Sequence, residues 1–276
     1  MKRILTIQDI SCVGKCSLTV ALPIISAMGV EAAVIPTAVL SAHTVFWNFT
    51  YKDMSDQILP ICDHWQAEGI TFDGIYTGYL GSFEQIDMMA DVFDTFGTAE
   101  NLILVDPVMA DHGKLYPTFD EAFAAKMATL CAKAGIIVPN ITEACFMTGA
   151  EYRETYDEAY VKELLLKLSK LGAKVSILTG VSLEEGKTGV MGYETATEEF
   201  SYYSHEKLPH SYHGTGDIFS STCMGALMTG KTWQEAVKVA ADYTAECIRL
   251  TIADPQHRFY GVNFEQAIPY LLERMK

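Results

Sequence analysis

The sequence predicts an α/β protein with a mostly parallel central sheet, helices on both faces and a small β-hairpin extension. Two observations lead to this prediction. From the N-terminus to Thr179, short and nearly all-apolar segments alternate with segments of helical spacing; such strands are typical of a parallel sheet covered on both faces. Hydrophobic residues make up 49% of the 276 residues, so a large core is available.

Each strand of this sheet is expected to be a short apolar run that ends in polar or turn-forming residues. Strands are predicted at residues 3–8, 32–36, 73–77, 101–105, 135–138 and 174–179. The segments between them place apolar residues at helical spacing, and Gly29 is a favourable C-cap for the first of them. Helices are predicted at residues 18–28, 54–67, 83–96, 121–132 and 160–171.

The pattern changes after Thr179. Segments 188–193 and 198–203 predict a β-hairpin, and residues 204–213 are polar and irregular. Helices are predicted at residues 218–228, 233–250 and 264–274. Because the chain shows no internal repeat, low-complexity segment or linker, residues 1–276 are expected to form a single domain.

The charge and the cysteines restrict the class of protein. The net charge is −15, with 35 acidic and 20 basic residues, which argues against a nucleic-acid or anionic-membrane partner. Residues 1–8 resemble a first strand more than a signal peptide, and no apolar run approaches the length of a membrane span. Seven scattered cysteines predict reduced thiols in a cytoplasmic protein. A bound phosphate would have to be held locally in so acidic a chain.

Residues 225–232 fit the Walker A pattern of a phosphate-binding loop residue for residue. Such a loop requires a strand before it and a helix after it. Here the preceding residues are helical in character, Gly230 suits a helix C-cap, and Thr232 with Glu235 forms a capping box. A helix–turn–helix connection therefore explains the segment better than a phosphate-binding loop.

A more informative motif is the run Gly214-Thr215-Gly216-Asp217, which opens a predicted helix. Two glycines and the first turn of a helix direct backbone N–H groups toward one point, which makes an anion site without lysines. Asp217 beside such a site suits a base that takes the proton of an attacking hydroxyl. The spacing is equally compatible with a helix cap and a turn.

Polar residues also follow two apolar strands of the predicted sheet. Asp106 ends one strand, and Asn140 and Glu143 follow the next, three residues apart. Together they offer oxygen ligands to a hydrated Mg²⁺. Taken singly, each has an ordinary alternative as a helix cap, a first-turn acid or a turn former.

His43 and Thr44 follow the second strand, and Tyr79 follows the third. An aromatic face with a nearby imidazole and hydroxyl can stack on a flat polar ring and hydrogen-bond to it. From the residues alone, a core or capping role is the better interpretation of His43.

These motifs, in this order, resemble those of pyridoxal kinases, which belong to the ribokinase-like superfamily. The resemblance rests on Ile7-Gln8, Ser41-x-His43-Thr44, the run TGYLGS at 77–82, Asp106-Pro107-Val108, Pro139-Asn140-x-x-Glu143 and residues 214–217. It covers the chain nearly end to end. The glycine–aspartate motif is common to the superfamily, whereas the His-Thr and Gly-Tyr-Leu-Gly stretches indicate the vitamin B6 branch.

The resemblance implies ATP-dependent phosphorylation of the 5′-hydroxymethyl group of pyridoxal, pyridoxine or pyridoxamine. Asp217 would be the catalytic base, and Gly214, Thr215 and Gly216 would form the anion hole for the phosphoryl group. His43, Thr44 and Tyr79 would line the B6 pocket. The residues expected to contact ATP are Asp106, Asp111, Asn140, Glu143, Thr179, Thr215 and Gly216, and the expected metal ligands are Asp106 and Glu143. The family also implies a homodimer, and it leaves a monovalent-cation requirement open.

One position departs from the family. Pyridoxal kinases place a serine directly after Ile-Gln, where it touches the pyridine ring, and this chain has Asp9 there, with Ser11 two residues on. The resemblance implies that Asp9 pairs with a protonated ring nitrogen or that Ser11 takes the serine's place. The alternative is that Asp9 only ends the strand.

Three other functions remain open at the level of sequence. A hydroxymethylpyrimidine kinase of thiamine synthesis would have a similar cleft. A B6-binding protein without turnover would not need the base at Asp217. A P-loop enzyme would depend on Lys231, in the segment that the helix–turn–helix interpretation assigns to a connection.

Overall fold

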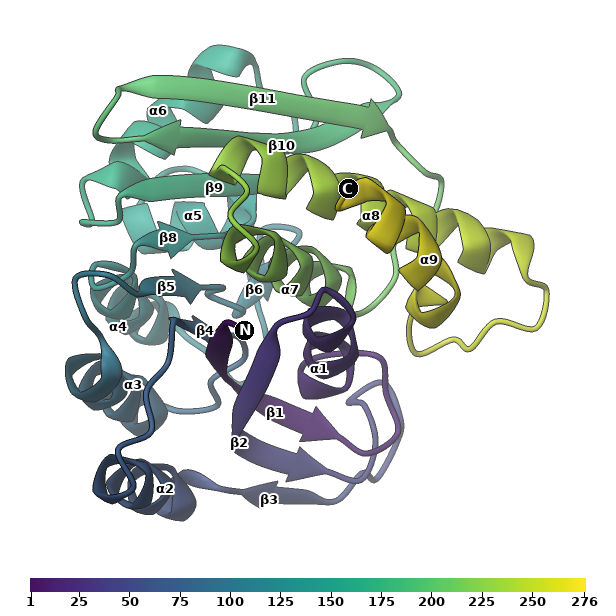
Figure 1. The fold of residues 1–276 in the computed structure, drawn as a ribbon. Coiled ribbons are helices and arrows are strands. Elements are labelled where there is room, and N and C mark those ends of the chain that lie inside the picture. Colours follow the sequence, from purple (N-terminus) through teal and green to yellow (C-terminus); the bar gives the residue numbers. More distant parts are fainter. The chain divides into compact units, whose positions relative to one another are not determined.

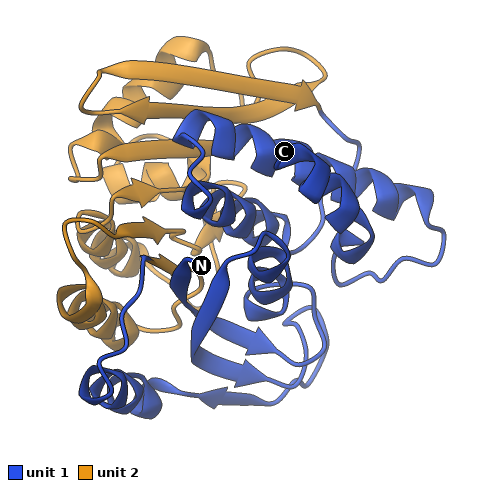
Figure 2. Cartoon of the chain, in the orientation of Figure 1, with its two compact units in different colours: residues 1–73, 207–276 blue, residues 74–206 orange.

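The structure is a computed structural model that describes residues 1–276 and confirms the α/β class (Figure 1). The chain forms two compact units (Figure 2). Unit 1 consists of residues 1–73 and 207–276, and unit 2 of residues 74–206. The single domain inferred from the sequence stays a prediction, and each unit is described by itself.

Unit 1 contains three strands. β1 (Arg3–Ser11) pairs in parallel with β2 (Glu31–Leu40), and β3 (Tyr51–Asp53) pairs antiparallel to β2. Its helices are α1 (Leu18–Ala27), α2 (Ser55–Ala67), α7 (Thr215–Met228), α8 (Trp233–Ala253) and α9 (Phe264–Arg274). Gly29, at φ +81°, follows α1 as predicted and lets the chain turn back into β2.

Unit 2 carries a six-strand set in the order β4-β5-β8-β9-β10-β11, parallel from β4 to β9 and antiparallel beyond. The strands are β4 (Gly74–Thr77), β5 (Leu102–Val105), β8 (Ile136–Ile137), β9 (Val175–Val181), β10 (Lys187–Glu194) and β11 (Glu199–Glu206). A separate small ladder joins β6 (Ala110–Asp111) to β7 (Lys114–Leu115). The helices are α3 (Phe83–Phe96), α4 (Glu121–Cys131), α5 (Ile141–Thr148) and α6 (Glu158–Ser169).

The predicted β-hairpin is confirmed and is longer than the sequence pattern indicates. β11 continues to Glu206, which pairs with Lys187 of β10, so the first residues of the segment expected to be irregular are extended. The polar composition of this segment gives little strand signal by itself. Its conformation comes from the ladder to the partner strand, which a local pattern does not contain.

The Walker A-like segment is a helix–turn–helix connection, as predicted. α7 continues through Gly225, where a Cβ atom would lie 2.5 Å from the sulfur of Met28, the C-cap residue of α1, so this glycine permits the end of α1 to pack closely on α7. Gly230, at φ +93°, follows the helix, and Thr232 caps α8 in a capping box with Glu235. No strand precedes the segment, and the phosphate-binding loop is excluded.

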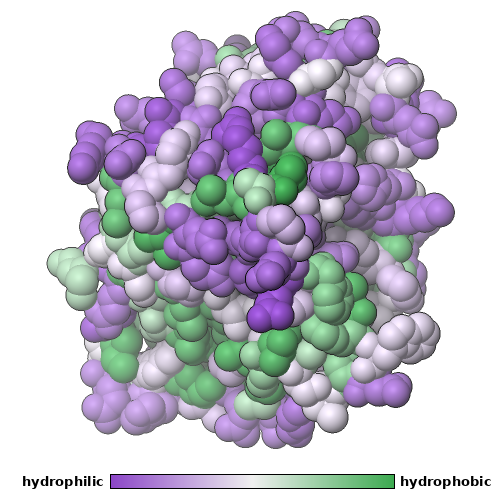
Figure 3. Space-filling model, turned by 90° about the vertical axis from the view of Figure 1, so that its right-hand side faces the viewer, coloured by the Kyte–Doolittle hydropathy of each residue, from purple (hydrophilic) through white to green (hydrophobic).

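Buried apolar side chains come from β1 in unit 1, from β4, β5 and β9 in unit 2, and from the buried faces of the helices of each unit. All seven cysteines are free thiols, which confirms that the chain has no disulfide framework. On the face drawn in Figure 3, hydrophobic and hydrophilic residues are interspersed.

No helix of residues 1–276 is both long and apolar enough to cross a membrane.

Candidate functional site

Within unit 1, the predicted catalytic run lies at the start of α7. Gly214 is the N-cap residue, at φ +80° and ψ +1°, and as a glycine it has no side chain of its own to cap the helix. Asp217 is half-buried in the first turn, and the Thr215 hydroxyl donates to the Tyr212 carbonyl at 3.2 Å. A helix N-terminus without a side-chain cap leaves backbone N–H groups and the positive end of the helix dipole for an anion.

Gly214 is required here for two separate reasons. Its positive φ is a conformation that only glycine adopts readily. In addition, a Cβ atom at this position would lie 1.9 Å from the carbonyl oxygen of Lys15. The loop between β1 and α1 therefore packs directly against the start of α7.

Asp9 lies inside β1, two residues before its end, so it does not merely terminate the strand. Its side chain is buried, and its carboxylate accepts hydrogen bonds from the Ser17 hydroxyl at 2.5 Å and the Ser11 hydroxyl at 3.4 Å. Burial raises the pKa of Asp9, while the hydrogen bonds from Ser17 and Ser11 oppose the shift. Asp9 and Ser11, the two candidates for a ring contact, are thus side by side.

The Cys16 thiol is affected by both Asp9 and the predicted base, Asp217. This buried thiol has its pKa raised first by burial and then by the nearby carboxylates of Asp217 and Asp9. Both carboxylates therefore lie close enough to one sulfur atom to act on it electrostatically. Asp9 and Asp217, which are far apart in the sequence, thus both act on the Cys16 thiol.

Cys16 and Ser17 were not among the residues that the sequence singled out. Ser17 precedes α1 at φ +49° and ψ −131°, an uncommon conformation for a residue with a side chain. Its hydroxyl makes the short hydrogen bond to Asp9. Val20 stands where a capping box would place an acid, and nothing in the local sequence indicates that Ser17 turns back toward the strand.

His43 lies beside the run that contains Asp217. Its ring is 4.9 Å from that of His213, the residue directly before Gly214, and its Nδ1 accepts a hydrogen bond from the Val45 N–H at 3.0 Å. Burial, and then the neighbouring His213, lower the pKa of His43 from 6.5 to about 4. A neutral imidazole is therefore presented near the anion site. Thr44 is exposed in the same turn.

Within unit 2, Asp106, Asn140 and Glu143 lie together. Asn140 caps α5 in a capping box, since its side chain accepts from the Glu143 N–H and Glu143 Oε2 accepts from the Asn140 N–H at 2.9 Å. The other oxygen of Glu143 accepts from the Met109 N–H at 3.1 Å, in the loop that follows Asp106. The helix-capping alternative is thus correct for Asn140, and it leaves the metal role as a prediction.

The electrostatics of this group are unusual. Asp106 and Glu143 are both buried, and burial followed by the neighbouring Asp106 carboxylate raises the pKa of Glu143 well above its ordinary value. The same two carboxylates add to the burial that raises the pKa of the Cys131 thiol. Two buried like charges side by side favour a cation or a shared proton.

Three further predicted residues of unit 2, Thr179, Asp111 and Tyr79, lie at different places relative to this acidic group. Thr179 in β9 pairs with Asn140 through an isolated bridge, so it belongs to the same group. Asp111 lies in β6, exposed, with its carboxylate 3.5 Å from His112 Nε2. Tyr79 follows β4 and its ring lies 5.7 Å from that of Phe119.

Apart from Tyr79, which was predicted to bind the substrate and lies in unit 2, the predicted residues form two groups, one in each unit. Unit 1 contains the predicted base, the predicted anion hole and four residues predicted to bind the acceptor: Asp9, Ser11, His43 and Thr44. Unit 2 gathers the acidic group expected to lie near the nucleotide. In both, the polar residues come from strand ends and from the helix starts that follow them, as expected for parallel α/β sheets.

Comparison with known protein families identifies the family to which this chain belongs. The model of the phosphomethylpyrimidine kinase family matches residues 21–262. The chain belongs to the phosphomethylpyrimidine kinase family. Most of unit 1 and all of unit 2 lie within the match.

Three similar proteins carry the names of two kinds of kinase. A Bacteroides thetaiotaomicron protein, provisionally described as a phosphomethylpyrimidine kinase and crystallised with pyridoxal, is 36% identical, with a TM-score of 0.92 over 98% of this chain and 95% of its own. The pyridoxal kinase from Lactobacillus plantarum is 29% identical, with a TM-score of 0.91 over 99% and 97%. The hydroxymethylpyrimidine/phosphomethylpyrimidine kinase of Bacillus subtilis (strain 168) is 27% identical over 82% of this chain and 79% of its own.

These similarities confirm the resemblance stated from the motifs and the ribokinase-like fold. They also show that this member of the phosphomethylpyrimidine kinase family is a kinase of the pyridoxal and hydroxymethylpyrimidine type. Relatives named for each of the two substrates match it to a similar degree.

Proposed function

We propose that this kinase transfers the γ-phosphoryl group of ATP to the 5′-hydroxymethyl group of pyridoxal, pyridoxine or pyridoxamine, with Asp217 as general base. The observation that carries the proposal is the start of α7, where Gly214 opens a helix without a side-chain cap and Asp217 stands in its first turn. A carboxylate there would repel a bound phosphate, so it needs a reason beyond binding.

The B6 ring, rather than a pyrimidine, is supported by two observations. A relative 36% identical to this chain was crystallised with pyridoxal. In addition, Asp9 is a buried carboxylate that acts, as Asp217 does, on the Cys16 thiol, and a carboxylate accepts a hydrogen bond from a protonated ring nitrogen. Asp9 and Ser11 would hold the ring, with His43 and Thr44 as further pocket residues of unit 1. Tyr79 of unit 2 stays a predicted substrate contact.

In the proposed reaction, Asp217 accepts the proton of the acceptor hydroxyl as its oxygen attacks the γ-phosphorus atom. The bond from that phosphorus to the bridging oxygen of ATP breaks, and ADP leaves. The N–H groups of Gly214, Thr215 and Gly216 would stabilise the negative charge on the transferring phosphoryl oxygens. No lysine is required for this step, which suits a chain with a net charge of −15.

The residues of unit 2 fit a divalent cation. Asp106 and Glu143 are a buried pair of carboxylates, and a cation would offset the repulsion that raises the pKa of Glu143. No group of three or more His, Cys, Asp or Glu side chains in residues 1–276 is arranged to hold a metal. Asp106 and Glu143 would therefore hold Mg²⁺ together with water and phosphate oxygens, and the ion would neutralise charge on the ATP phosphates. Asn140, Thr179 and Asp111 are the other proposed ATP contacts in this unit.

The second candidate is phosphorylation of hydroxymethylpyrimidine, because the matching family and the Bacillus subtilis relative carry that activity in their names. A substrate panel separates the two. Purified protein is assayed with Mg-ATP and each of pyridoxal, pyridoxine, pyridoxamine and hydroxymethylpyrimidine. We expect the highest kcat/KM with a B6 vitamer, and a higher value with hydroxymethylpyrimidine would reject the proposal.

Exchange of Asp217 for asparagine tests the assigned base and the non-catalytic alternative. Asp217→Asn keeps the size of the side chain and removes its basicity, so we expect pyridoxal to bind with unchanged affinity. ATP should bind at least as tightly as to the wild type, because the repulsion between the carboxylate and the phosphates is removed. Turnover should fall by about 10²–10⁴-fold, the usual contribution of general-base catalysis. Calorimetric binding and product formation measure the two quantities. Turnover close to that of the wild type would contradict the role of Asp217.

A further inference from the structure

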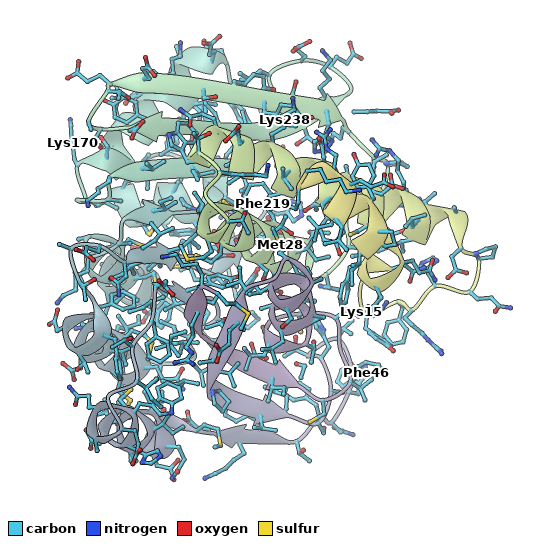
Figure 4. The ribbon with its side chains drawn as sticks, in the orientation of Figure 1. Lys15, Met28, Phe46, Lys170, Phe219 and Lys238 are labelled. Atoms are coloured by element: carbon cyan, nitrogen blue, oxygen red, sulfur yellow. The ribbon has the colours of Figure 1, made fainter.

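Lys15 makes contacts to the C-terminal part of unit 1. Its ammonium donates to the Val262 carbonyl at 3.0 Å and to Glu265 Oε2 at 2.8 Å, and it lies 5.7 Å from the centre of the Phe264 ring. Its aliphatic stem packs on Gly261, where a Cβ atom would lie 2.5 Å from Lys15 Cβ. Figure 4 shows Lys15 beside the loop that precedes α9.

The backbone of Lys15 contacts a second element. Its carbonyl oxygen occupies the space in which Gly214 would carry a Cβ atom, at 1.9 Å. Gly214 is the N-cap of α7. This contact therefore sets how closely the loop between β1 and α1 approaches the proposed anion hole. Lys15 thus lies between the C-terminal loop on one side and the start of α7 on the other.

The neighbours of Lys15 belong to the acceptor side of the site. Cys16 follows it and lies close to both Asp9 and Asp217. Ser17, in its uncommon backbone conformation, donates to Asp9. A change in the position of Lys15 would therefore alter the spacing between the acceptor side and the base.

The loop before α9 supports the other acceptor-side turn as well. Phe46, in the turn that follows His43, packs on Phe259 and Tyr260, with ring centres 5.0 and 5.4 Å away. Figure 4 labels Phe46 as well as Lys15. Both turns that carry proposed acceptor residues are thus in contact with residues 259–262 of one loop.

We infer that Lys15 is a positioning residue for phosphoryl transfer. It connects the loop between β1 and α1 to the loop that precedes α9, and it thereby sets the distance between the bound acceptor and the start of α7. This inference rests on the proposed function. Lys15 differs from an ordinary surface ion pair because its side chain is only 14% exposed and it also donates to a backbone carbonyl.

The test compares Lys15→Met, which keeps the stem and removes the ammonium, with Lys15→Arg, which keeps a donor. We expect Lys15→Met to lower kcat about tenfold, because small displacements of reacting groups cost rate steeply, and to leave the KM for ATP within about twofold. Lys15→Arg should recover most of the loss. All values are taken well below Tm and corrected for the concentration of active sites, so that unfolded protein does not contribute.

The matched control is Lys133→Met, which removes a lysine from an ion pair of similar length, 2.7 Å to Asp94, on the surface of unit 2. It should leave kcat unchanged. If Lys15→Met does not fold, Glu265→Gln replaces it, and a decrease in kcat of about threefold is expected from the weakened ion pair. The inference is wrong if Lys15→Met, or Glu265→Gln used in its place, has the kcat of the wild type. It is also wrong if Lys15→Arg does not recover the kcat that Lys15→Met loses.

Hydrogen exchange separates failure of the inference from failure of the proposed function. In Lys15→Met, backbone amides of residues 12–17 and 215–218 should exchange faster than in the wild type, and in Lys133→Met they should not. If the wild-type protein phosphorylates neither B6 vitamers nor hydroxymethylpyrimidine, the proposed function is wrong. Unchanged exchange in Lys15→Met would then show that Lys15 holds nothing in place.

Discussion

The contact between Gly214 and Lys15 leads to a quantitative prediction about stability. Replacing Gly214 with alanine has two costs: the left-handed backbone conformation at φ +80°, and a Cβ atom placed 1.9 Å from the Lys15 carbonyl oxygen. Gly29→Ala isolates the first cost. Gly29 has nearly the same φ, +81°, and a Cβ atom there would meet nothing within 4 Å.

The two variants should therefore differ by the steric term alone. For Gly29→Ala we expect a loss of about 1 kcal/mol of unfolding free energy. The left-handed conformation costs an alanine roughly 1–2 kcal/mol, and the lower conformational entropy of the unfolded alanine chain offsets part of that cost. Gly214→Ala adds the displacement of a backbone carbonyl, comparable to overpacking at about 1–3 kcal/mol. Its expected total is about 2–4 kcal/mol.

Urea unfolding of both variants and the wild type measures these losses. Gly214→Ala should have the lower midpoint, at an unchanged slope with urea concentration. In thermal scans the difference corresponds to about 2–4 °C for each kcal/mol in a chain of this size. Equal losses in the two variants would refute the reasoning, because they would show that the Lys15 carbonyl is not in tight contact with Gly214.

Two further predictions concern the Walker A-like segment 225–232 and the neighbouring rings of His43 and His213. Lys231→Ala should leave kcat and the KM for ATP within about twofold, the size of a distant surface effect, since Lys231 lies in a helix–helix connection; a loss of ATP binding would revive the P-loop interpretation. The pKa of His43 is lowered from 6.5 to about 4, so the unfolded chain binds more protons between these pH values and stability falls as pH decreases through them. His43→Asn, which can still accept from Val45, should flatten that part of the stability–pH curve; a curve identical to that of the wild type would contradict the assignment.

Much of the fold could be predicted because it depends on local patterns. α3 (Phe83–Phe96) and α9 (Phe264–Arg274) have the predicted boundaries, each being an apolar stripe bounded by breaks in its helical spacing. The hairpin turn and the capping box at Thr232 are likewise local. β8 shortens to Ile136–Ile137, and β2 lengthens to Leu40, because strand ends depend on the neighbouring strand.

The candidate site was predictable in its residue types but not in its contacts. Motif order identified Asp217 and Asp9 separately, and the structure brings both beside Cys16, a residue with no distinguishing pattern. Glu143 was expected to face a metal, and the structure shows both of its oxygens also accepting backbone N–H groups. Contacts of this kind join residues far apart in the chain, and periodicity carries no information about them.

The acidic composition of the chain restricts how its site can bind an anion. With 35 acidic and 20 basic residues, an anion is best bound where backbone N–H groups rather than lysines provide the positive potential. A site of that kind depends on backbone position, since the N–H groups of a helix start cannot reorient as a side chain can. Lys15 directs its ammonium away from Gly214, to Val262 and Glu265, while its carbonyl packs against Gly214. A basic residue beside the anion site would thus contribute by holding the backbone donors in place rather than by binding phosphate itself.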